Sequence, residues 1–109
     1  MERLIKPKPL PLEFEGKGSQ KGFLFTQVKR GERAAIYRKT HSEFNVSYFE
    51  VIRLMSHNGR DIHGKYYPPA EWYPGENAFG KDAFCFLGNQ EALVEKKFQK
   101  LNSNILDNE

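Results

Sequence analysis

His57, Asp61 and His63 lie within seven consecutive positions and are the closest approach in the chain to a set of metal ligands. Imidazoles and carboxylates bind Zn²⁺ and related ions when several of them converge on one point. The intervening Asn58-Gly59 is a strong turn dipeptide, and it interrupts the alternation that would place all three side chains on one strand face. The pattern therefore favours the polar end of a hairpin. A metal-dependent nuclease that uses these residues is the last of three functional alternatives.

Other residue types that support catalysis occur singly or in segments without regular structure. Glu71, Glu76 and Asp82 could form paired carboxylates for acid–base hydrolysis, but their loop context favours solvated acids. Cys85 is the only cysteine, which excludes an intrachain disulfide, and its apolar neighbours predict a small buried core residue rather than a nucleophile. We therefore expect a protein that is not an enzyme and that uses no metal and no cofactor.

Aromatic residues are concentrated between residues 66 and 86, where seven of the fifteen Phe, Trp and Tyr residues occur among three prolines. Proline excludes a regular helix or a central strand, and large rings are costly to leave in water. The segment is therefore either a loop packed onto a sheet or a surface that binds a partner. Because Tyr and Trp dominate interface energetics, the favoured hypothesis is a protein-binding surface that comprises Tyr66, Tyr67, Trp72, Tyr73 and Phe79. In the alternative, Trp72 simply closes one end of the sheet.

Positive charge is distributed unevenly along the chain. Residues 1–39 carry ten Lys and Arg against four Glu, whereas residues 40–109 carry seven against ten acidic residues. A basic hairpin with exposed rings could hold phosphates and stack bases, as in proteins that bind single-stranded nucleic acid. The candidates for this alternative function are Lys29, Arg30, Arg33, Arg38 and Tyr37. The same cations could instead form the solvated face and edge of a sheet, where they prevent pairing between molecules.

The order of the predicted elements indicates a single α+β domain. Residues 1–21 are rich in Pro, Gly and Lys and are expected to form a flexible arm, and residues 102–109 a frayed tail. Between them, over residues 22–101, we expect strands at 23–30, 33–39, 47–55, 60–67 and 83–87 and a helix at about 90–101. The predicted fold is a mainly antiparallel sheet of three to five strands with one C-terminal helix packed on one face.

Two periodic patterns support this arrangement. Along residues 47–55 apolar side chains occupy both faces, which is typical of a central strand covered on both sides. Asn89 is a candidate N-cap for the helix. After it, apolar residues recur at helical spacing and form one stripe, with Leu93 alongside Val94, Phe98 and Leu101.

Composition excludes several classes of protein. The chain of 109 residues can form one hydrophobic core, and its 39% hydrophobic and 28% charged residues are ordinary for a globular domain. No apolar run approaches the roughly 20 residues that cross a bilayer. Prolines at positions 7, 9 and 11 interrupt any apolar signal segment after Arg3 and Lys6. A cytoplasmic protein is therefore expected.

Several short strings of residues form a recurrent layout, namely Phe25-Thr26-Gln27-Val28-Lys29-Arg30, Ala35-Ile36-Tyr37, Phe49-Glu50-Val51-Ile52 and Tyr73-Pro74 before a glycine loop. In this layout, over roughly residues 23–101, the chain resembles small uncharacterised proteins encoded by bacteriophages and bacterial mobile elements. It departs from the layout at Phe79-Gly80, where a tryptophan-glycine would be expected. The resemblance implies a phage or mobile-element origin and a protein that binds host machinery in the host cytoplasm. The resemblance provides no catalytic activity that could be assigned to this chain.

Overall fold

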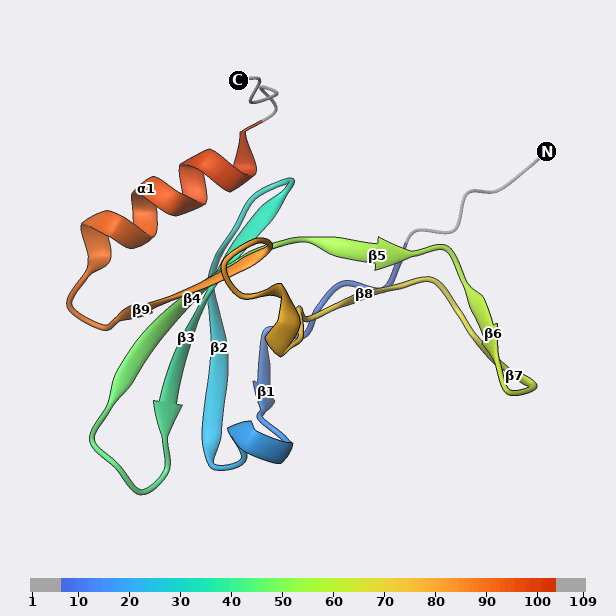
Figure 1. Ribbon diagram of the computed structural model, residues 1–109, viewed down its shortest axis with the longest axis horizontal. Coiled ribbons are helices and arrows are strands. Elements are labelled where there is room, and N and C mark those ends of the chain that lie inside the picture. Colours follow the sequence, from blue (N-terminus) through green and yellow to red (C-terminus); the bar gives the residue numbers. More distant parts are fainter. Residues whose placement is uncertain (1–6, 104–109) are drawn as a thin grey trace.

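The main element of the fold is a five-stranded antiparallel sheet. The computed structural model describes residues 7–103, and in these residues the spatial order of the main sheet is β1-β2-β3-β4-β9. The elements are β1 (Glu13–Glu15), β2 (Phe23–Arg30), β3 (Ala34–His41), β4 (Ser47–Arg53), β9 (Ala83–Leu87) and the helix α1 (Glu91–Asn102). The helix lies over β3 and β4 on one face of the sheet (Figure 1). The predicted α+β class and the single C-terminal helix are confirmed.

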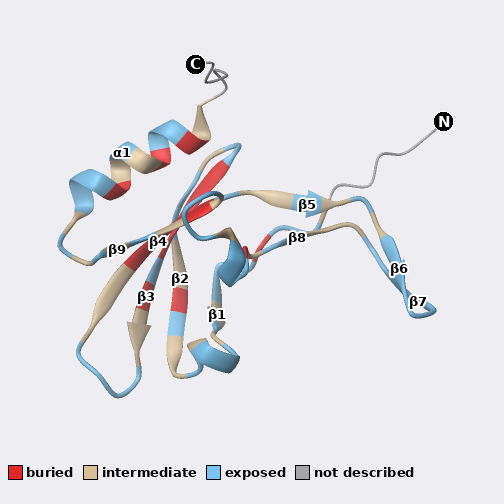
Figure 2. Cartoon of the chain, in the orientation of Figure 1, coloured by how far each residue is buried: buried red, intermediate tan, exposed pale blue. Residues whose placement is uncertain are grey.

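The core on the helix side follows from the alternation of side chains along β3 and β4. Every second residue of each strand packs against the apolar stripe of α1. Figure 2 shows buried positions on β3, β4 and α1. The buried residues of this cluster are Ala34, Ile36, Phe49, Val51, Val94, Phe98 and Leu101. Leu93, which was expected to accompany the stripe, is 49% exposed because it lies about 100° around the helix from Val94.

The opposite face of the sheet carries a second core. Its buried residues are Leu10, Phe25, Ala35, Tyr37, Ile52 and Ala83, with Phe14, Phe23, Leu54 and Tyr73 packed against them. Leu10 and Phe14 come from the N-terminal segment, and Tyr73 comes from the proline-rich segment before β9. Strand β4 is therefore covered on both faces, as the double-sided apolar pattern of residues 47–55 predicted.

The expected flexible arm at residues 1–21 requires correction over the part that the structure describes. Residues Glu13–Glu15 pair with β2 as the outer strand of the sheet, and a 3₁₀ turn, η1, follows at Gly18–Gln20. Leu10 is buried, because this segment supplies apolar side chains that cover the open face of β2 and β3. The remainder of the predicted arm, residues 1–6, and residues 104–109 of the predicted tail lie outside the described residues.

A two-stranded extension projects from the sheet (Figure 1). It consists of β5 (Met55–His57) paired with β8 (Ala70–Trp72) and, beyond them, β6 (Arg60–Ile62) paired with β7 (Lys65–Tyr67). The single strand expected at residues 60–67 is thus a hairpin. It turns at His63-Gly64, whose φ angles of 52° and 82° suit a two-residue hairpin loop. Asn58-Gly59, the turn signal in the sequence, instead connects β5 to β6.

Local hydrogen bonds form at both ends of β9. The Gly80 amide donates to the Ala83 carbonyl at 2.8 Å, and the Leu87 amide donates to the Gln90 side chain at 2.9 Å. These bonds satisfy outward-facing backbone groups at the two ends of β9, which is an edge strand. The helix N-cap is Gln90 and its side chain makes no capping bond, so the expected cap at Asn89 is not formed.

Within residues 7–103, no helix combines the length and the apolar character needed to span a membrane.

Candidate binding surfaces on the projecting arm and in the adjoining pocket

The projecting arm, defined here as residues 55–72, carries a ladder of rings and cations. Trp72 stacks on the His57 ring with centroids 6.1 Å apart, and the Arg60 guanidinium lies 5.5 Å from the Trp72 ring. Arg60 lies opposite Tyr67 in the β6–β7 pair, and the Lys65 ammonium lies 5.3 Å from the Tyr67 ring. The face ladder therefore consists of His57, Trp72, Arg60, Tyr67 and Lys65. Every residue of β6 and β7 is exposed.

The arm presents apolar area together with two cations on one face of the β6–β7 pair, while the carboxylate of Asp61 lies opposite Tyr66 on the other face. Tyr66 is 58% exposed, and Ile62, Tyr67 and Trp72 are also among the exposed large hydrophobic residues. Neither Arg60 nor Lys65 forms an ion pair with a carboxylate of residues 7–103. Exposed rings beside free cations can pack against a partner and pair with its carboxylates.

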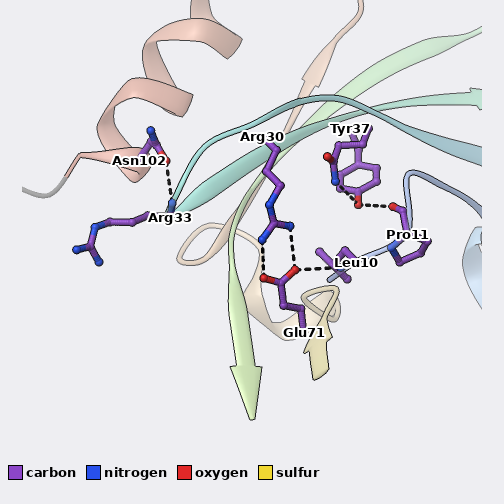
Figure 3. Close-up of polar contacts among 8 residues, drawn as sticks. Leu10, Pro11, Arg30, Arg33, Tyr37, Glu71 and Asn102 are labelled. Atoms are coloured by element: carbon purple, nitrogen blue, oxygen red, sulfur yellow. Dashed lines mark hydrogen bonds and ion pairs between the residues drawn. The ribbon is translucent and has the colours of Figure 1, made fainter. Parts of the chain in front are cut away.

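The base of the arm is fixed to the sheet by Glu71 (Figure 3). Its carboxylate accepts two hydrogen bonds from the Arg30 guanidinium, at 2.9 and 2.6 Å, and one from the Leu10 amide at 2.9 Å. The hydrogen bond from Arg30 holds the pKa of Glu71 below its ordinary value. Lys8 adds a parallel bridge to Ala70, so the N-terminal segment, β2 and β8 meet at one point. Hydrogen bonds therefore hold the base of the arm to the sheet, whereas the residues of β6 and β7 at its tip are exposed.

A pocket lies beside the base of the arm, on the sheet face away from α1. Its floor is formed by side chains from all five strands of the main sheet, and its walls come from η1 and from η2 (Glu76–Ala78). Ser19 on η1 donates a hydrogen bond to Glu76 on η2 at 2.8 Å. The lining includes Phe14, Phe25, Lys39, Glu50, Tyr73, Phe79 and Cys85.

Two buried charges lie side by side at the bottom of this pocket. Lys39 is 8% exposed and Glu50 is 3% exposed, and the ammonium donates to the carboxylate at 3.0 Å. The second oxygen of Glu50 accepts a hydrogen bond from the Tyr73 hydroxyl at 2.7 Å, and Lys39 also donates to Gln20 at 2.7 Å. Burial, followed by the Glu50 charge, raises the pKa of Tyr73 far above its ordinary value, so this hydroxyl remains a donor.

Cys85 differs from its sequence-based prediction. It is exposed and not buried, because β9 is an edge strand and alternate residues of that strand point into the pocket. Burial of the sulfur atom and the charge of Glu50 raise the pKa of the thiol. A neutral thiol is a poor nucleophile.

The five residues predicted for protein binding separate into two groups. Tyr66, Tyr67 and Trp72 lie on the arm and are exposed, whereas Tyr73 turns inward and packs on Phe14, Phe25 and Tyr37. Phe79 lies at the pocket. The predicted loop at residues 66–79 is therefore not one surface, because the chain leaves the arm after Trp72, the last residue of β8, and Tyr73 packs in the core.

Most of the residues predicted for nucleic-acid binding have intramolecular contacts. Lys29 pairs with Glu95 at 2.8 Å and Arg30 with Glu71. Tyr37 is fully buried, so its ring cannot stack on a base. The exposed Arg38 lies over the Phe49 ring at 5.1 Å, and the Arg33 amide donates to Asn102 at 2.8 Å. These residues do not form one open basic surface.

The residues considered for a metal site do not converge. Among residues 7–103 there is no group of three or more His, Cys, Asp or Glu side chains placed to hold one ion. Nδ1 of His57 accepts a hydrogen bond from the Gly59 amide at 3.1 Å, and its ring stacks on Trp72. His63 occupies the hairpin turn. This region is the polar end of a hairpin, as the sequence pattern favoured.

Lys39 and Glu50 are the site residues that sequence reasoning missed. Glu50 is the single acid within the strand predicted to be covered on both sides, and a buried carboxylate requires a partner. That signal was available. The sequence did not identify Lys39 as the partner of Glu50, because the two residues lie diagonally across the β3–β4 pair. Only the register that places Lys39 opposite Tyr48 brings them together. Comparisons with protein-family models, curated proteins and solved structures find no match to this chain.

Proposed function

We propose that this chain is a non-enzymatic binding protein that captures a partner protein with its projecting arm. The observation that carries the proposal is the face ladder, where exposed rings and unpaired cations extend beyond the sheet on a two-stranded support. A β6–β7 hairpin gains no core burial from these side chains. Their burial against a partner would supply the area that isolated hairpins lack.

The chemistry of the ladder points to an acidic partner surface. Arg60 and Lys65 alternate with Trp72 and Tyr67, so a partner that packs on the rings also brings its carboxylates within reach of both cations. Such charge complementarity raises the association rate and selects against basic partners. The phage and mobile-element resemblance supports a host protein as the partner, bound in the host cytoplasm.

Site-specific photo-crosslinking tests this proposal. The photoreactive residue p-benzoylphenylalanine replaces Ile62, which is 41% exposed and lies opposite Lys65 on the ladder face of the β6–β7 pair, and the protein is irradiated in a bacterial lysate. The control carries the same group at Phe44, which is 62% exposed and lies in the β3–β4 loop away from the arm. We expect one cross-linked host protein from position 62 and none from position 44, with loss of the product when unlabelled wild-type chain competes.

A pair of substitutions provides the matched functional test. Tyr66→Ala with Tyr67→Ala removes two exposed rings from the arm, and Phe44→Ala removes one exposed ring elsewhere. We expect the arm variant to lose the cross-linked partner while both variants keep the wild-type melting temperature. Equal cross-linking at both positions, no competition by wild-type chain, or unfolding of the arm variant would each contradict the proposal.

Single-stranded nucleic acid is the second candidate partner, and the face ladder is again the observation that favours it. Rings on a strand pair stack bases, and neighbouring cations hold phosphates. The hairpin residues first considered are less suitable, because Tyr37 is buried and Lys29 and Arg30 are paired. Fluorescence polarisation with labelled oligothymidylate would show binding that weakens steeply with salt, and Arg60→Gln would reduce the salt slope by about one. Absence of binding at low salt eliminates this candidate.

A further inference from the structure

The pocket beside the arm has the composition of a small-molecule site. Its volume is about 660 Å³, which lies in the range of pockets that hold drug-sized ligands. Four aromatic rings contribute to its lining, namely those of Phe14, Phe25, Tyr73 and Phe79. Phe14 stacks face to face on Phe25, with centroids 4.7 Å apart and an interplanar angle of 4°, so the two parallel rings hold each other in a fixed orientation at the pocket. This wall is suited to a planar aromatic molecule.

The floor of the pocket is polar and already ordered. A buried ion pair is costly to maintain, and a pair of apolar side chains would serve stability as well. Each oxygen of Glu50 accepts one hydrogen bond, from Lys39 and from Tyr73, whereas an ionised carboxylate offers about four acceptor positions. Glu50 therefore retains acceptor capacity in a pocket that it lines. An N–H or O–H group of a ligand would use it.

The charge of the lining disfavours anions. Lys17 and Lys39 face three carboxylates, those of Glu15, Glu50 and Glu76. Lys39 is compensated by Glu50 at 3.0 Å, and its ammonium lies over the Phe23 ring at 4.6 Å. Among the residues that the structure describes, Lys39 is the one basic group on the floor, and Glu50 already accepts its hydrogen bond. The pocket is complementary to neutral or cationic molecules.

We propose that this pocket binds a small planar aromatic molecule that donates an N–H hydrogen bond to Glu50, with its rings against Phe14, Phe25 and Tyr73. The site is independent of the arm ladder and of the proposed partner protein. The proposal rests on the conjunction of an aromatic wall, a nine-tenths buried carboxylate with spare acceptor capacity and a net acidic lining.

Indole and benzothiophene are the probes that test it, because they share size and shape but only indole has a donor. Binding to the wild-type protein is followed by NMR shifts of the β9 amides and by protection of Cys85 from iodoacetamide. We expect saturable indole binding with Kd below about 1 mM, and at least about tenfold weaker binding of benzothiophene, because a hydrogen bond to a charged group is lost. Indole-3-acetate should bind more weakly than indole.

Two substitutions on β9 localise the binding. Cys85→Trp places a large side chain in the pocket from an exposed strand position, and it should abolish the indole-dependent shifts. Leu87→Trp adds the same group two residues farther along the exposed strand face, outside the pocket, and it should leave indole binding unchanged. If Cys85→Trp does not fold, the indole and benzothiophene comparison on the wild-type chain still decides the question.

Three results would overturn the proposal. They are the absence of saturable indole binding up to its solubility limit, equal affinity for indole and benzothiophene, and indole binding that leaves Cys85 fully reactive. Equal affinity would mean that the pocket takes up apolar molecules without using Glu50. None of these results bears on partner capture by the arm, which is measured by cross-linking at position 62.

Discussion

Arg30 and Glu71 form a two-point ion pair that joins the sheet to the base of the projecting arm. The guanidinium Nη1 donates to one carboxylate oxygen at 2.9 Å and Nη2 to the other at 2.6 Å. Arg30 belongs to β2 and Glu71 to β8, and the two residues are 41 positions apart in sequence. A third hydrogen bond to Glu71, from the Leu10 amide, adds the N-terminal segment (Figure 3). The Glu71 carboxylate therefore anchors the arm together with the backbone bonds of Lys8 to Pro69 and Glu71.

Glu71→Gln should destabilise the protein by about 1–2 kcal/mol, because it removes a charge-assisted pair that solvent partly screens. The Glu71 side chain is only 13% exposed, whereas Arg30 is 33% exposed. Urea unfolding followed by circular dichroism measures the change. Glu95→Gln removes the exposed pair with Lys29 and is the control, for which we expect no measurable change. An equal effect of both substitutions would contradict the anchoring role.

The stabilisation by Glu71 should depend on pH in a defined direction. Its pKa is lowered in the folded protein below the ordinary value of 4.5, because Arg30 donates to the ionised form. The contribution is therefore complete above that ordinary value and disappears as pH falls through the lower folded pKa. The difference in unfolding free energy between wild type and Glu71→Gln should be constant near neutral pH and shrink in acid. A difference that grows on acidification would contradict the assignment.

Lys39 and Glu50 should show strong coupling in a double-mutant cycle. Glu50→Leu leaves a buried ammonium without its carboxylate and should cost about 3 kcal/mol, whereas Glu50→Leu combined with Lys39→Met should cost much less. Both side chains are nine-tenths buried or more in the sheet interior. Chemical denaturation of the four proteins gives the coupling energy. Additive effects would mean that the two charges are solvated independently.

The helix should depend on the buried stripe and not on its apolar neighbour. Phe98→Ala removes a buried ring from the cluster on the helix side of the sheet and should cost about 3–5 kcal/mol. Leu93→Ala, at a position that is 49% exposed, should change stability by less than about 0.5 kcal/mol. Thermal unfolding of both variants provides the comparison. A large effect of Leu93→Ala would indicate that this residue has a partner in solution.

The hairpin at the tip of the arm should depend on the backbone freedom of Gly64. At Gly64 and at Gly75, no heavy atom lies within 4 Å of the position that a Cβ would occupy, but only Gly64 has a positive φ, of 82°. Gly64→Ala should therefore weaken the β6–β7 pair by about 1 kcal/mol, and Gly75→Ala should not. Hydrogen exchange of the β6 and β7 amides measures this local effect. Unchanged exchange in Gly64→Ala would contradict it.

Local pattern determined most of the fold. Strands 23–30 and 83–87 were predicted at the residues where they form, and the helix was displaced by a single residue, because alternation and helical spacing are properties of short segments. The α+β class followed, since a single amphipathic helix must bury its stripe on a sheet. The sequence also identified Tyr66, Tyr67 and Trp72 as unusual, and these residues are exposed.

Tertiary structure decided where those elements meet. The sequence did not reveal that residues 13–15 extend the sheet or that the aromatic segment divides between an arm and a core, because both depend on pairing over long separations. It did not reveal that Arg30 binds Glu71 or that Lys39 neutralises Glu50, since strand register alone brings these charges together. Composition and periodicity act within a few residues, whereas a pocket is made by residues that only the folded backbone brings together.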